Sequence, residues 1–263
     1  MPKCGAIFGL DLALPSVDLT STGAVSTCHD CDPRAAARRG FLSLAAAGVL
    51  TALVPAVGRA AAGPATTLTA DQALTRLKEG NDRYVRQPQL CLAALSQGRA
   101  SVAQHQAPWA TLVSCADSRV PPELLFGGVG MGELFVARNA GNTVDTATMG
   151  TIEYGSGALG VPLIVVLGHE RCGAVAAACE IAEKDTQFPG SIGTMARVIV
   201  PAAQATRGQP GNWVENTVRE SARRTAAKIA TESPVISGLV RLGKVKVVAG
   251  RYDLDDGKVE FFV

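Results

Sequence analysis

The fold is decided by the stretch Val161-Pro162-Leu163-Ile164-Val165-Val166-Leu167-Gly168-His169-Glu170-Arg171-Cys172-Gly173. Its apolar run, Val161 to Leu167, is typical of a buried strand, and the small apolar residues after Gly173 begin a helix. Two further runs of buried-strand character, Ala110 to Ser114 and Leu134 to Ala137, precede it. Strands that alternate with helical patterns predict βαβ units and a parallel sheet.

The two ends of this region complete the prediction. Thr69 to Val85 is expected to form a helix, because its apolar residues recur at helical spacing and Thr69 can cap it. The segments Lys244 to Leu254 and Lys258 to Val263 flank Asp255-Asp256-Gly257, which indicates a hairpin. The predicted fold class is therefore α/β, a parallel sheet core flanked by helices with an antiparallel C-terminal edge strand, in one domain spanning residues 63–263.

The first 62 residues have the features of an export signal. The pair Arg38-Arg39 precedes a weakly hydrophobic run, Phe41 to Val57, and Ala60 and Ala62 occupy the positions that a signal peptidase requires. We interpret residues 1–62 as a twin-arginine signal peptide with an N-terminal extension, cleaved near Ala62. The expected location is the periplasm, and the export machinery is an expected partner of the leader.

The alternative for the apolar run is an uncleaved membrane anchor. The run is about 17 residues long and is broken by Gly48 and Pro55, whereas a transmembrane helix needs roughly 20 residues. Stable membrane insertion is therefore not expected. Nucleic acid is not an expected partner either, because the formal net charge is only +2 and no basic run is interleaved with aromatic residues.

The seven cysteines fall into two groups. Three of them precede the arginine pair and belong to the leader: Cys4, Cys28 and Cys31. The cluster Cys28-His29-Asp30-Cys31 is interpreted as incidental leader sequence, with a metal or redox site as the alternative. Of the other four, Cys91 and Cys179 belong to no Cys-x-x-Cys pair and are expected to be buried thiols.

Cys115, His169 and Cys172 are the candidate metal ligands. Each follows a predicted strand, and in open α/β sheets ligands bind beyond the carboxyl ends of the strands. His169 and Cys172 are three residues apart at a strand-to-helix turn, where the helix dipole favours a thiolate. Two thiolates and one imidazole suit zinc, with one ion per subunit and a fourth position left for catalysis.

Asp117 and Arg119 are the candidate catalytic pair. A carboxylate alone beside the metal would fill the fourth position, but an arginine fork can hold Asp117 away from it. Asp117 is then a zinc ligand only in a closed state. The alternative is an ordinary salt bridge at the end of a strand.

Several separate motifs resemble those of the β-class carbonic anhydrases in order and spacing. They are Gly80-Asn81-Asp82-Arg83-Tyr84, Cys115-Ala116-Asp117-Ser118-Arg119-Val120, Phe135-Val136-Ala137-Arg138-Asn139-Ala140-Gly141-Asn142, Ile152-Glu153-Tyr154, Gly168-His169 with Cys172-Gly173-Ala174, and the closing Tyr252-Asp253-Leu254 and Gly257-Lys258-Val259. The resemblance implies zinc held by the three ligands above, with Asp117 and Arg119 as the catalytic dyad. It also implies a homodimer or a tetramer of dimers with the active site near the subunit boundary.

The resemblance further implies a substrate pocket. Gln106 matches a glutamine that hydrogen-bonds a substrate oxygen, Phe135 and Tyr154 match apolar pocket positions, and Gly173 is placed with them beside Cys172. Core packing is the alternative role for the two aromatic residues. His105 and Tyr154 are the candidates for carrying the proton away.

At one place the chain departs from the family pattern, and at another it lacks a residue that marks one subgroup of the family. Glu170-Arg171 stands where many members have a small residue after the zinc histidine. One subgroup with a bicarbonate-inhibited closed state has a tryptophan three residues before the first zinc cysteine, and this chain has Leu112 there. We therefore expect an open zinc with Asp117 paired to Arg119.

The expected function is the zinc-dependent reversible hydration of carbon dioxide to bicarbonate and a proton. Two alternatives stay open. An enzyme of the same fold could hydrolyse carbonyl sulfide or carbon disulfide, since only the pocket would change. The chain could also be a zinc-stabilised anion-binding protein without turnover. Such a protein, however, would have no use for an arginine that holds a carboxylate off the metal.

Overall fold

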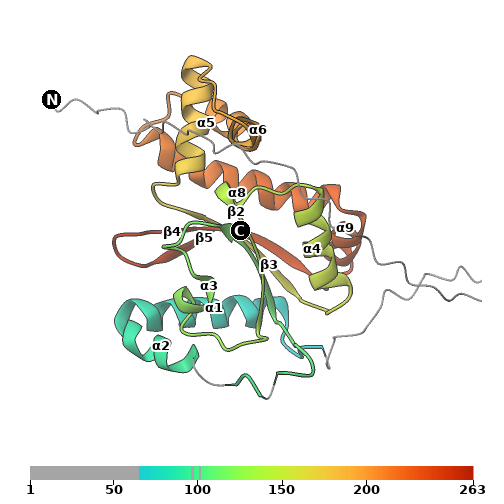
Figure 1. Cartoon of the computed structure of the whole chain (residues 1–263). Coiled ribbons are helices and arrows are strands. Elements are labelled where there is room, and N and C mark those ends of the chain that lie inside the picture. Colours follow the sequence, from blue (N-terminus) through green and yellow to red (C-terminus); the bar gives the residue numbers. More distant parts are fainter. Residues whose placement is uncertain (1–64, 96–97, 101, 263) are drawn as a thin grey trace, which may run out of the picture. The chain divides into compact units, whose positions relative to one another are not determined.

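The chain folds around a five-stranded sheet in a computed structural model that describes residues 65–95, 98–100 and 102–262 (Figure 1). The strand order is β2-β1-β3-β4-β5, in which the first four strands are parallel and β5 runs antiparallel to β4. The strands are β1 (Ala110–Cys115), β2 (Leu134–Asn139), β3 (Leu163–His169), β4 (Lys246–Tyr252) and β5 (Val259–Phe262). The predicted α/β class with an antiparallel C-terminal edge strand is confirmed.

Helices cover both faces of this sheet (Figure 1). They are α1 (Ala70–Arg86), α2 (Pro88–Leu95), α3 (Pro122–Leu125), α4 (Thr146–Gly157), α5 (Gly173–Lys184), α6 (Ser191–Arg197), α7 (Val200–Thr206), α8 (Trp213–Glu232) and α9 (Pro234–Arg241), with a short 3-10 turn η1 (Ala140–Asn142) after β2. Figure 1 shows α1, α2 and α3 on one side of the sheet and α4, α5, α8 and α9 on the other.

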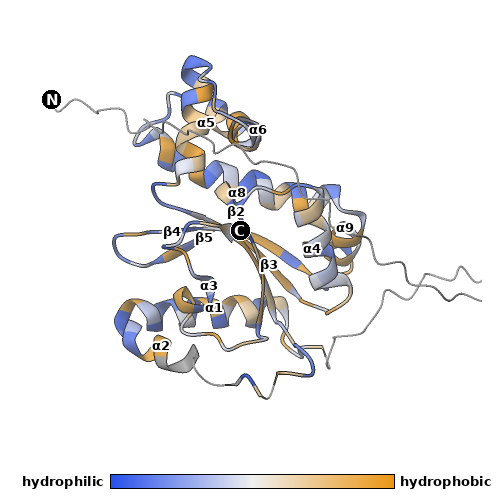
Figure 2. Cartoon of the chain, in the orientation of Figure 1, coloured by the Kyte–Doolittle hydropathy of each residue, from blue (hydrophilic) through white to orange (hydrophobic). Residues whose placement is uncertain are grey.

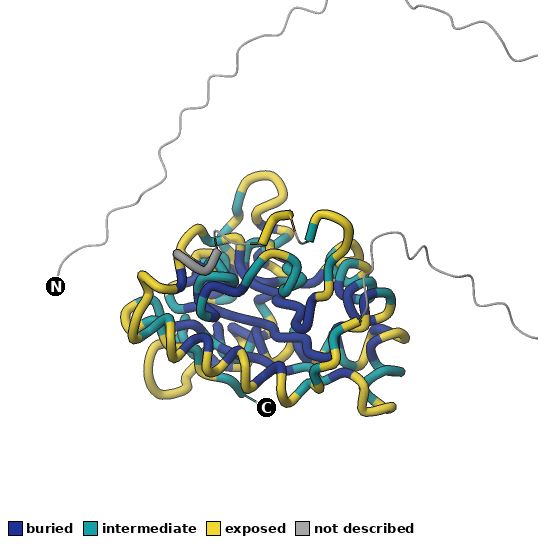
Figure 3. Tube along the Cα trace, turned by 90° about the horizontal axis from the view of Figure 1, so that it is seen from below, coloured by how far each residue is buried: buried dark blue, intermediate teal, exposed yellow. Residues whose placement is uncertain are grey.

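Alternate residues of the central strands face the two helical layers, as a pleated strand requires. Leu112 and Val165 pack in one buried cluster with α1, whereas Val113 and Val166 pack in another with α4, α8 and α9. Because both faces are covered, β1 and β3 are buried at every residue. The apolar strands and the buried centre are visible in Figures 2 and 3.

The first described helix begins where its sequence predicts. The Thr69 hydroxyl accepts a hydrogen bond from the Gln72 N–H at 3.2 Å, and the Gln72 side chain accepts one from the Thr69 N–H at 2.8 Å. This reciprocal capping satisfies two N–H groups that the helix cannot satisfy itself. The Asn81 side chain, which is buried, then ties α1 to the Leu125 carbonyl and to both Gly257 and Val259 of the β4–β5 hairpin.

The structure differs from the sequence prediction at some boundaries. Helix α2 lies in a stretch for which the sequence predicts no element. Strand β3 begins at Leu163, two residues later than expected, and extends to His169. Strands β1 and β2 likewise run on to Cys115 and Asn139. The candidate ligands Cys115 and His169 are therefore the last residues of their strands.

The predicted leader, residues 1–62, lies outside the described residues, and so do the cluster Cys28-His29-Asp30-Cys31 and the domain boundary at residue 63. Among the helices that the structure describes, none combines the length and apolar character needed to cross a bilayer.

Candidate metal centre

Three buried side chains with metal-binding atoms converge at the carboxyl end of the sheet. Strands β1 and β3 are parallel neighbours in which Ser114 lies opposite Leu167, so Cys115 and His169 end them at the same edge. Cys172 is the N-cap of α5 and follows three residues later. The ligand atoms of Cys115, His169 and Cys172 all lie within 4.8 Å of one another, and their residues are at most 5% exposed.

The chemistry of this cluster fits a zinc ion. His169 Nδ1 is 2.9 Å from the carbonyl oxygen of Glu170 and donates to it, which leaves Nε2 directed at the cysteines. Nε2 is fully buried and has no hydrogen-bond partner among the described residues. Leaving a buried polar atom unpaired costs about 1–3 kcal/mol, and a metal ion would satisfy it. Two sulfur atoms and one imidazole nitrogen are ligands that zinc prefers.

The two cysteines share their protons unequally. A hydrogen bond from Cys172 lowers the pKa of Cys115 to about 4, and a hydrogen bond from the Gly141 N–H to the Cys115 sulfur, at 3.3 Å, acts in the same direction. The hydrogen bond to Cys115, together with burial, raises the pKa of Cys172. Burial lowers the pKa of His169, but its contacts with the Cys115 thiolate outweigh burial, so the pKa is raised. The centre is therefore built to hold negative charge on sulfur.

Asp117 lies beside the three ligand atoms and is held by Arg119. Arg119 donates from its backbone N–H and from Nε to Asp117 Oδ1, both at 2.9 Å, and from Nη2 to Oδ2 at 2.7 Å. This hydrogen-bonded pairing holds the pKa of Asp117 well below its usual range. Asp117 Oδ2 is 3.8 Å from His169 Nε2. The expected Asp117–Arg119 ion pair is present; that it keeps the carboxylate off a metal ion stays a prediction.

The loop that carries Cys115 and Asp117 is braced from β2. Arg138 donates from Nε to the Cys115 carbonyl at 2.9 Å and from Nη2 to the Asp117 carbonyl at 2.6 Å. Gly141, with φ of 74°, brings its N–H to the Cys115 sulfur. Arg138 and Gly141 were quoted in the sequence only as parts of a motif, and their spacing gave no sign of these contacts.

Within one chain, three of the four expected pocket residues lie away from the ligand cluster. Phe135 lies opposite Thr111, four residues before Cys115 in β1, which is about 13 Å along the strand at roughly 3.3 Å per residue. Tyr154 on α4 lies with Phe135, since their ring centroids are 6.1 Å apart. Gln106 precedes Ala107, whose N–H bonds to the Gly132 carbonyl before β2 begins. These residues therefore lie toward the amino ends of the strands.

Of the remaining candidates, Gly173 lies beside the ligand cluster, and His105, Cys91 and Cys179 lie outside it. Gly173 is the first residue of α5, beside Cys172, and a methyl group built there would meet no described atom within 4 Å. It therefore lines open space next to the ligand cluster. His105 is exposed and precedes Gln106 at the far edge of the sheet. Cys91 and Cys179 are buried free thiols outside the cluster.

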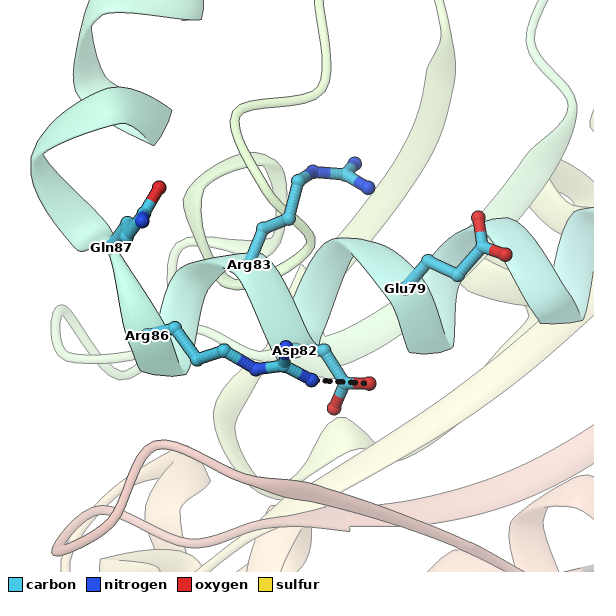
Figure 4. Close-up of a pocket in the computed structure, with 5 residues that line it drawn as sticks. All are labelled: Glu79, Asp82, Arg83, Arg86 and Gln87. Atoms are coloured by element: carbon cyan, nitrogen blue, oxygen red, sulfur yellow. Dashed lines mark ion pairs between the residues drawn. The ribbon is translucent and has the colours of Figure 1, made fainter.

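A separate surface hollow lies on α1 and has a volume of about 360 Å³ (Figure 4). Most of the side chains that line it are charged, and two of them, Asp82 and Arg86, form an ion pair at 3.7 Å. None of the site residues that the sequence predicts lines this hollow: its residues are Glu79, Asp82, Arg83, Arg86 and Gln87. It gives no competing location for the chemistry.

Comparison with known proteins agrees with this geometry. A family profile described as carbonic anhydrase matches residues 110–259, which include all three ligands and the Asp117–Arg119 pair. The chain belongs to the β-class carbonic anhydrases. Carbonic anhydrase 2 of Mycobacterium tuberculosis is 38% identical over 183 residues, which cover 69% of this chain and 87% of the relative. The carbonic anhydrase of Pseudomonas aeruginosa is 32% identical over 188 residues, covering 68% and 84%.

Solved structures of β-class carbonic anhydrases share the fold. The enzyme of Coccomyxa, solved with acetazolamide, has a TM-score of 0.53 and 26% identity, and the match covers 71% of this chain and 85% of that one. A tetrameric β-carbonic anhydrase of the ascomycete Sordaria macrospora gives a TM-score of 0.55 at 23% identity, covering 69% and 89%. This carbonic anhydrase therefore has the sheet and helical layers of its class.

Proposed function

We propose that this carbonic anhydrase catalyses the reversible hydration of carbon dioxide to bicarbonate and a proton, with one zinc ion held by Cys115, His169 and Cys172. The observation that carries the proposal is the convergence of three buried ligand atoms within 4.8 Å, one of them an unpaired imidazole nitrogen. When bound, zinc would supply a Lewis acid that makes water acidic enough to react near neutral pH.

The residues around this position have distinct roles in the proposed reaction. Asp117 stays a carboxylate because Arg119 engages both of its oxygens. Its Oδ2 accepts a proton or hydrogen bond from the attacking water and so orients the oxygen lone pair toward the carbon of carbon dioxide. Arg119 holds the Asp117 carboxylate in the orientation that this hydrogen bond requires. Arg138 fixes the backbone that carries both Cys115 and Asp117.

The substrate pocket is proposed to be completed by a second copy of the chain. Gln106, Phe135 and Tyr154 lie at the far end of the sheet from their own ligand cluster, yet they lie along β2, which is the edge strand of the described sheet. A homodimer, or a tetramer of dimers, that packs at this edge would bring them to a neighbour's site. The tetrameric relative from Sordaria macrospora supports an oligomer.

Mixing two inactive variants tests the shared pocket. One variant carries C172S and the other carries Q106L, and both are co-expressed with different tags and purified as the mixed oligomer. A shared site gives partial recovery of hydration, because one intact ligand cluster then faces one intact pocket. If Gln106 acted within its own chain, the mixed oligomer would stay as inactive as its parents.

Stopped-flow hydration of carbon dioxide, with carbonyl sulfide as comparison substrate, tests the reaction itself. The proposal predicts turnover of carbon dioxide with little hydrolysis of carbonyl sulfide. Preferential hydrolysis of carbonyl sulfide or carbon disulfide would favour a hydrolase of the same fold. Zinc binding without turnover of either substrate would favour an anion-binding protein.

We further propose export to the periplasm by the twin-arginine route. The support is in the sequence alone: the Arg38-Arg39 pair, the weakly hydrophobic run after it and the small residues up to Ala62. Folded export allows zinc to be loaded in the reducing cytosol, so that metal-bound thiolates cross protected from oxidation. Replacing both arginines by lysine should leave the precursor in the cytoplasm; normal export of that variant would exclude this route.

A further inference from the structure

The two residues between the ligands His169 and Cys172 are held by hydrogen bonds to His169, to β4, to α8 and to the β4–β5 hairpin. Glu170 and Arg171 separate His169 from Cys172. The Glu170 carbonyl accepts the hydrogen bond from His169 Nδ1 at 2.9 Å, and the Glu170 N–H donates to the Tyr252 carbonyl on β4 at 2.9 Å. The residue whose carbonyl sets the orientation of the histidine ring is therefore itself held to β4 through its N–H.

The Glu170 side chain adds a second attachment. Its Oε2 accepts a hydrogen bond from the Leu254 N–H at 3.1 Å, and its Oε1 lies 3.7 Å from Nη2 of Arg251. The two side chains are 15% and 11% exposed. This pairing is thus largely shielded from water, unlike the exposed ion pairs whose contribution is small.

Arg251 connects this loop to α8 and to the hairpin. It donates from Nε to Glu215 Oε2 at 2.8 Å and from Nη1 to Asp253 Oδ2 at 3.0 Å. The other oxygen of Glu215 accepts the Arg171 N–H at 2.9 Å. Arg171 has φ of 52°, in the left-handed region that side chains other than glycine rarely adopt. The carboxylate of Glu215 therefore holds an unfavourable backbone conformation directly before Cys172.

We propose that Arg251, with Glu170 and Glu215, forms a positioning network that aligns His169 and Cys172 for zinc and so raises the affinity of the site for the metal. The inference rests on the proposed zinc function. Groups that orient a metal-ligating histidine contribute to affinity because they fix the tautomer and the ring before the metal arrives. Here the guanidinium of Arg251 holds the Glu215 carboxylate, which accepts the Arg171 N–H of the same peptide group whose Glu170 carbonyl accepts His169 Nδ1. None of the three network residues contacts the ligand atoms directly.

Zinc affinity of variants tests the network, measured by competition with a chromophoric chelator at neutral pH. R251M removes the guanidinium and keeps an extended side chain, and we expect zinc affinity to fall about 10- to 100-fold. R251K should recover only part of the loss, because the compact ammonium of lysine lacks the planar fork of donors that the guanidinium directs at separate carboxylates. E170Q weakens the same network at its other end and should also lower the affinity.

R219M is the matched control. Arg219 lies on α8 and, like Arg251, forms an ion pair, in this case with Glu260 of β5, but it touches neither Glu170 nor Glu215 through any described hydrogen bond or ion pair. It should lower the melting temperature without changing zinc affinity. Substitution with cobalt gives a second readout, because distorted ligation in R251M changes the intensity of the metal absorption bands, whereas a loss of stability alone does not.

The outcomes separate this inference from the function on which it rests. If the wild-type protein binds no stoichiometric zinc, the proposed function fails. If the wild type binds zinc and R251M binds it equally tightly, with an unchanged cobalt spectrum, the positioning network is wrong. Should R251M fail to fold, E170Q decides by the same measurement, and unchanged affinity there overturns the inference.

Discussion

The substitution D117N isolates the carboxylate of the proposed catalytic pair. Asp117 accepts three hydrogen bonds from Arg119, two at Oδ1 and one at Oδ2. An asparagine can keep the two at Oδ1, but its amide nitrogen then faces the Nη2–H of Arg119, donor against donor. It also presents a donor on the side that lies 3.8 Å from His169 Nε2. The shape is preserved while the proton acceptor beside the metal position is lost.

The expected loss of activity follows from the removal of the carboxylate oxygen that lies beside the metal position. Only Asp117 Oδ2 both contacts Arg119 and lies next to the ligand cluster, so no other described carboxylate can replace it there. General-base catalysis by a positioned side chain contributes about 10²- to 10⁴-fold. We therefore expect kcat/KM for carbon dioxide to fall about 100-fold or more, which is roughly 2.7 kcal/mol in the activation barrier.

Stopped-flow hydration and zinc analysis on the same samples test this expectation. D117N should carry as much zinc as the wild type, because Asp117 is not among the three ligands. D145N is the matched control: Asp145 caps α4 by accepting the Thr148 N–H at 2.8 Å, and asparagine caps equally well. A D117N enzyme with full zinc and unchanged kcat/KM would refute the assigned role, while a loss of zinc would place Asp117 among the ligands.

Four further outcomes are expected. N81L leaves three backbone groups without the buried partner they have in the wild type, and should lower the free energy of unfolding by about 3 kcal/mol in urea denaturation; a change near zero would contradict the assigned contacts. G141A places a methyl group 2.7 Å from Ile199 Cδ1 at φ of 74°, and should cost about 1–2 kcal/mol for the left-handed conformation alone, with weaker zinc binding by the same chelator assay. Arg119 lowers the pKa of Asp117, so the pair stabilises the fold above the ordinary aspartate pKa of about 4 and loses that effect as pH falls toward the lower folded pKa. The difference in free energy of unfolding between wild type and R119M should therefore shrink below about pH 4. A difference that stays constant with pH would argue against the pair. Removal of zinc by a chelator should lower the melting temperature, since the metal binds only the folded chain, and a melting curve unaffected by chelator would contradict a buried metal.

The sequence was sufficient for the central strands because β1 and β3 are buried on both faces. Continuous apolar runs such as Ala110 to Ser114 are expected for a parallel sheet covered by helices, and they match β1 and β3 closely. The helix α2 was missed for the opposite reason. Its residues, Pro88–Leu95, are apolar but include exposed Leu90 and Leu92, so they lack the one-sided periodicity that identifies a helix packed on a core.

The ligand cluster could be predicted because each ligand stands at the end of a predicted strand or at the turn after it. The residues that hold those ligands could not. Glu215 and Arg251 are separated from Arg171 by 44 and 80 positions along the chain, and only the packing of α8 and β4 brings them to the loop. The one signal in the sequence was local: the charged pair Glu170-Arg171, which departs from the pattern that the resemblance implies.

The placement of the pocket residues needed the strand register. The resemblance implied that Phe135 belongs to a pocket near the subunit boundary and that Cys115 holds the metal, but it did not place the two residues relative to each other. In the sheet, Phe135 lies opposite Thr111 and not opposite Cys115. A sequence motif does not show which end of its strand meets a partner strand, or which copy of the chain completes a site.

The most direct test of the account is carbon dioxide hydration by purified protein whose zinc content has been measured, compared with C172S. We predict about one zinc per chain and rapid hydration in the wild type, with both zinc and hydration lost in C172S. A wild-type protein without stoichiometric zinc, or a C172S protein that hydrates carbon dioxide as fast as the wild type, would contradict the proposed metal centre.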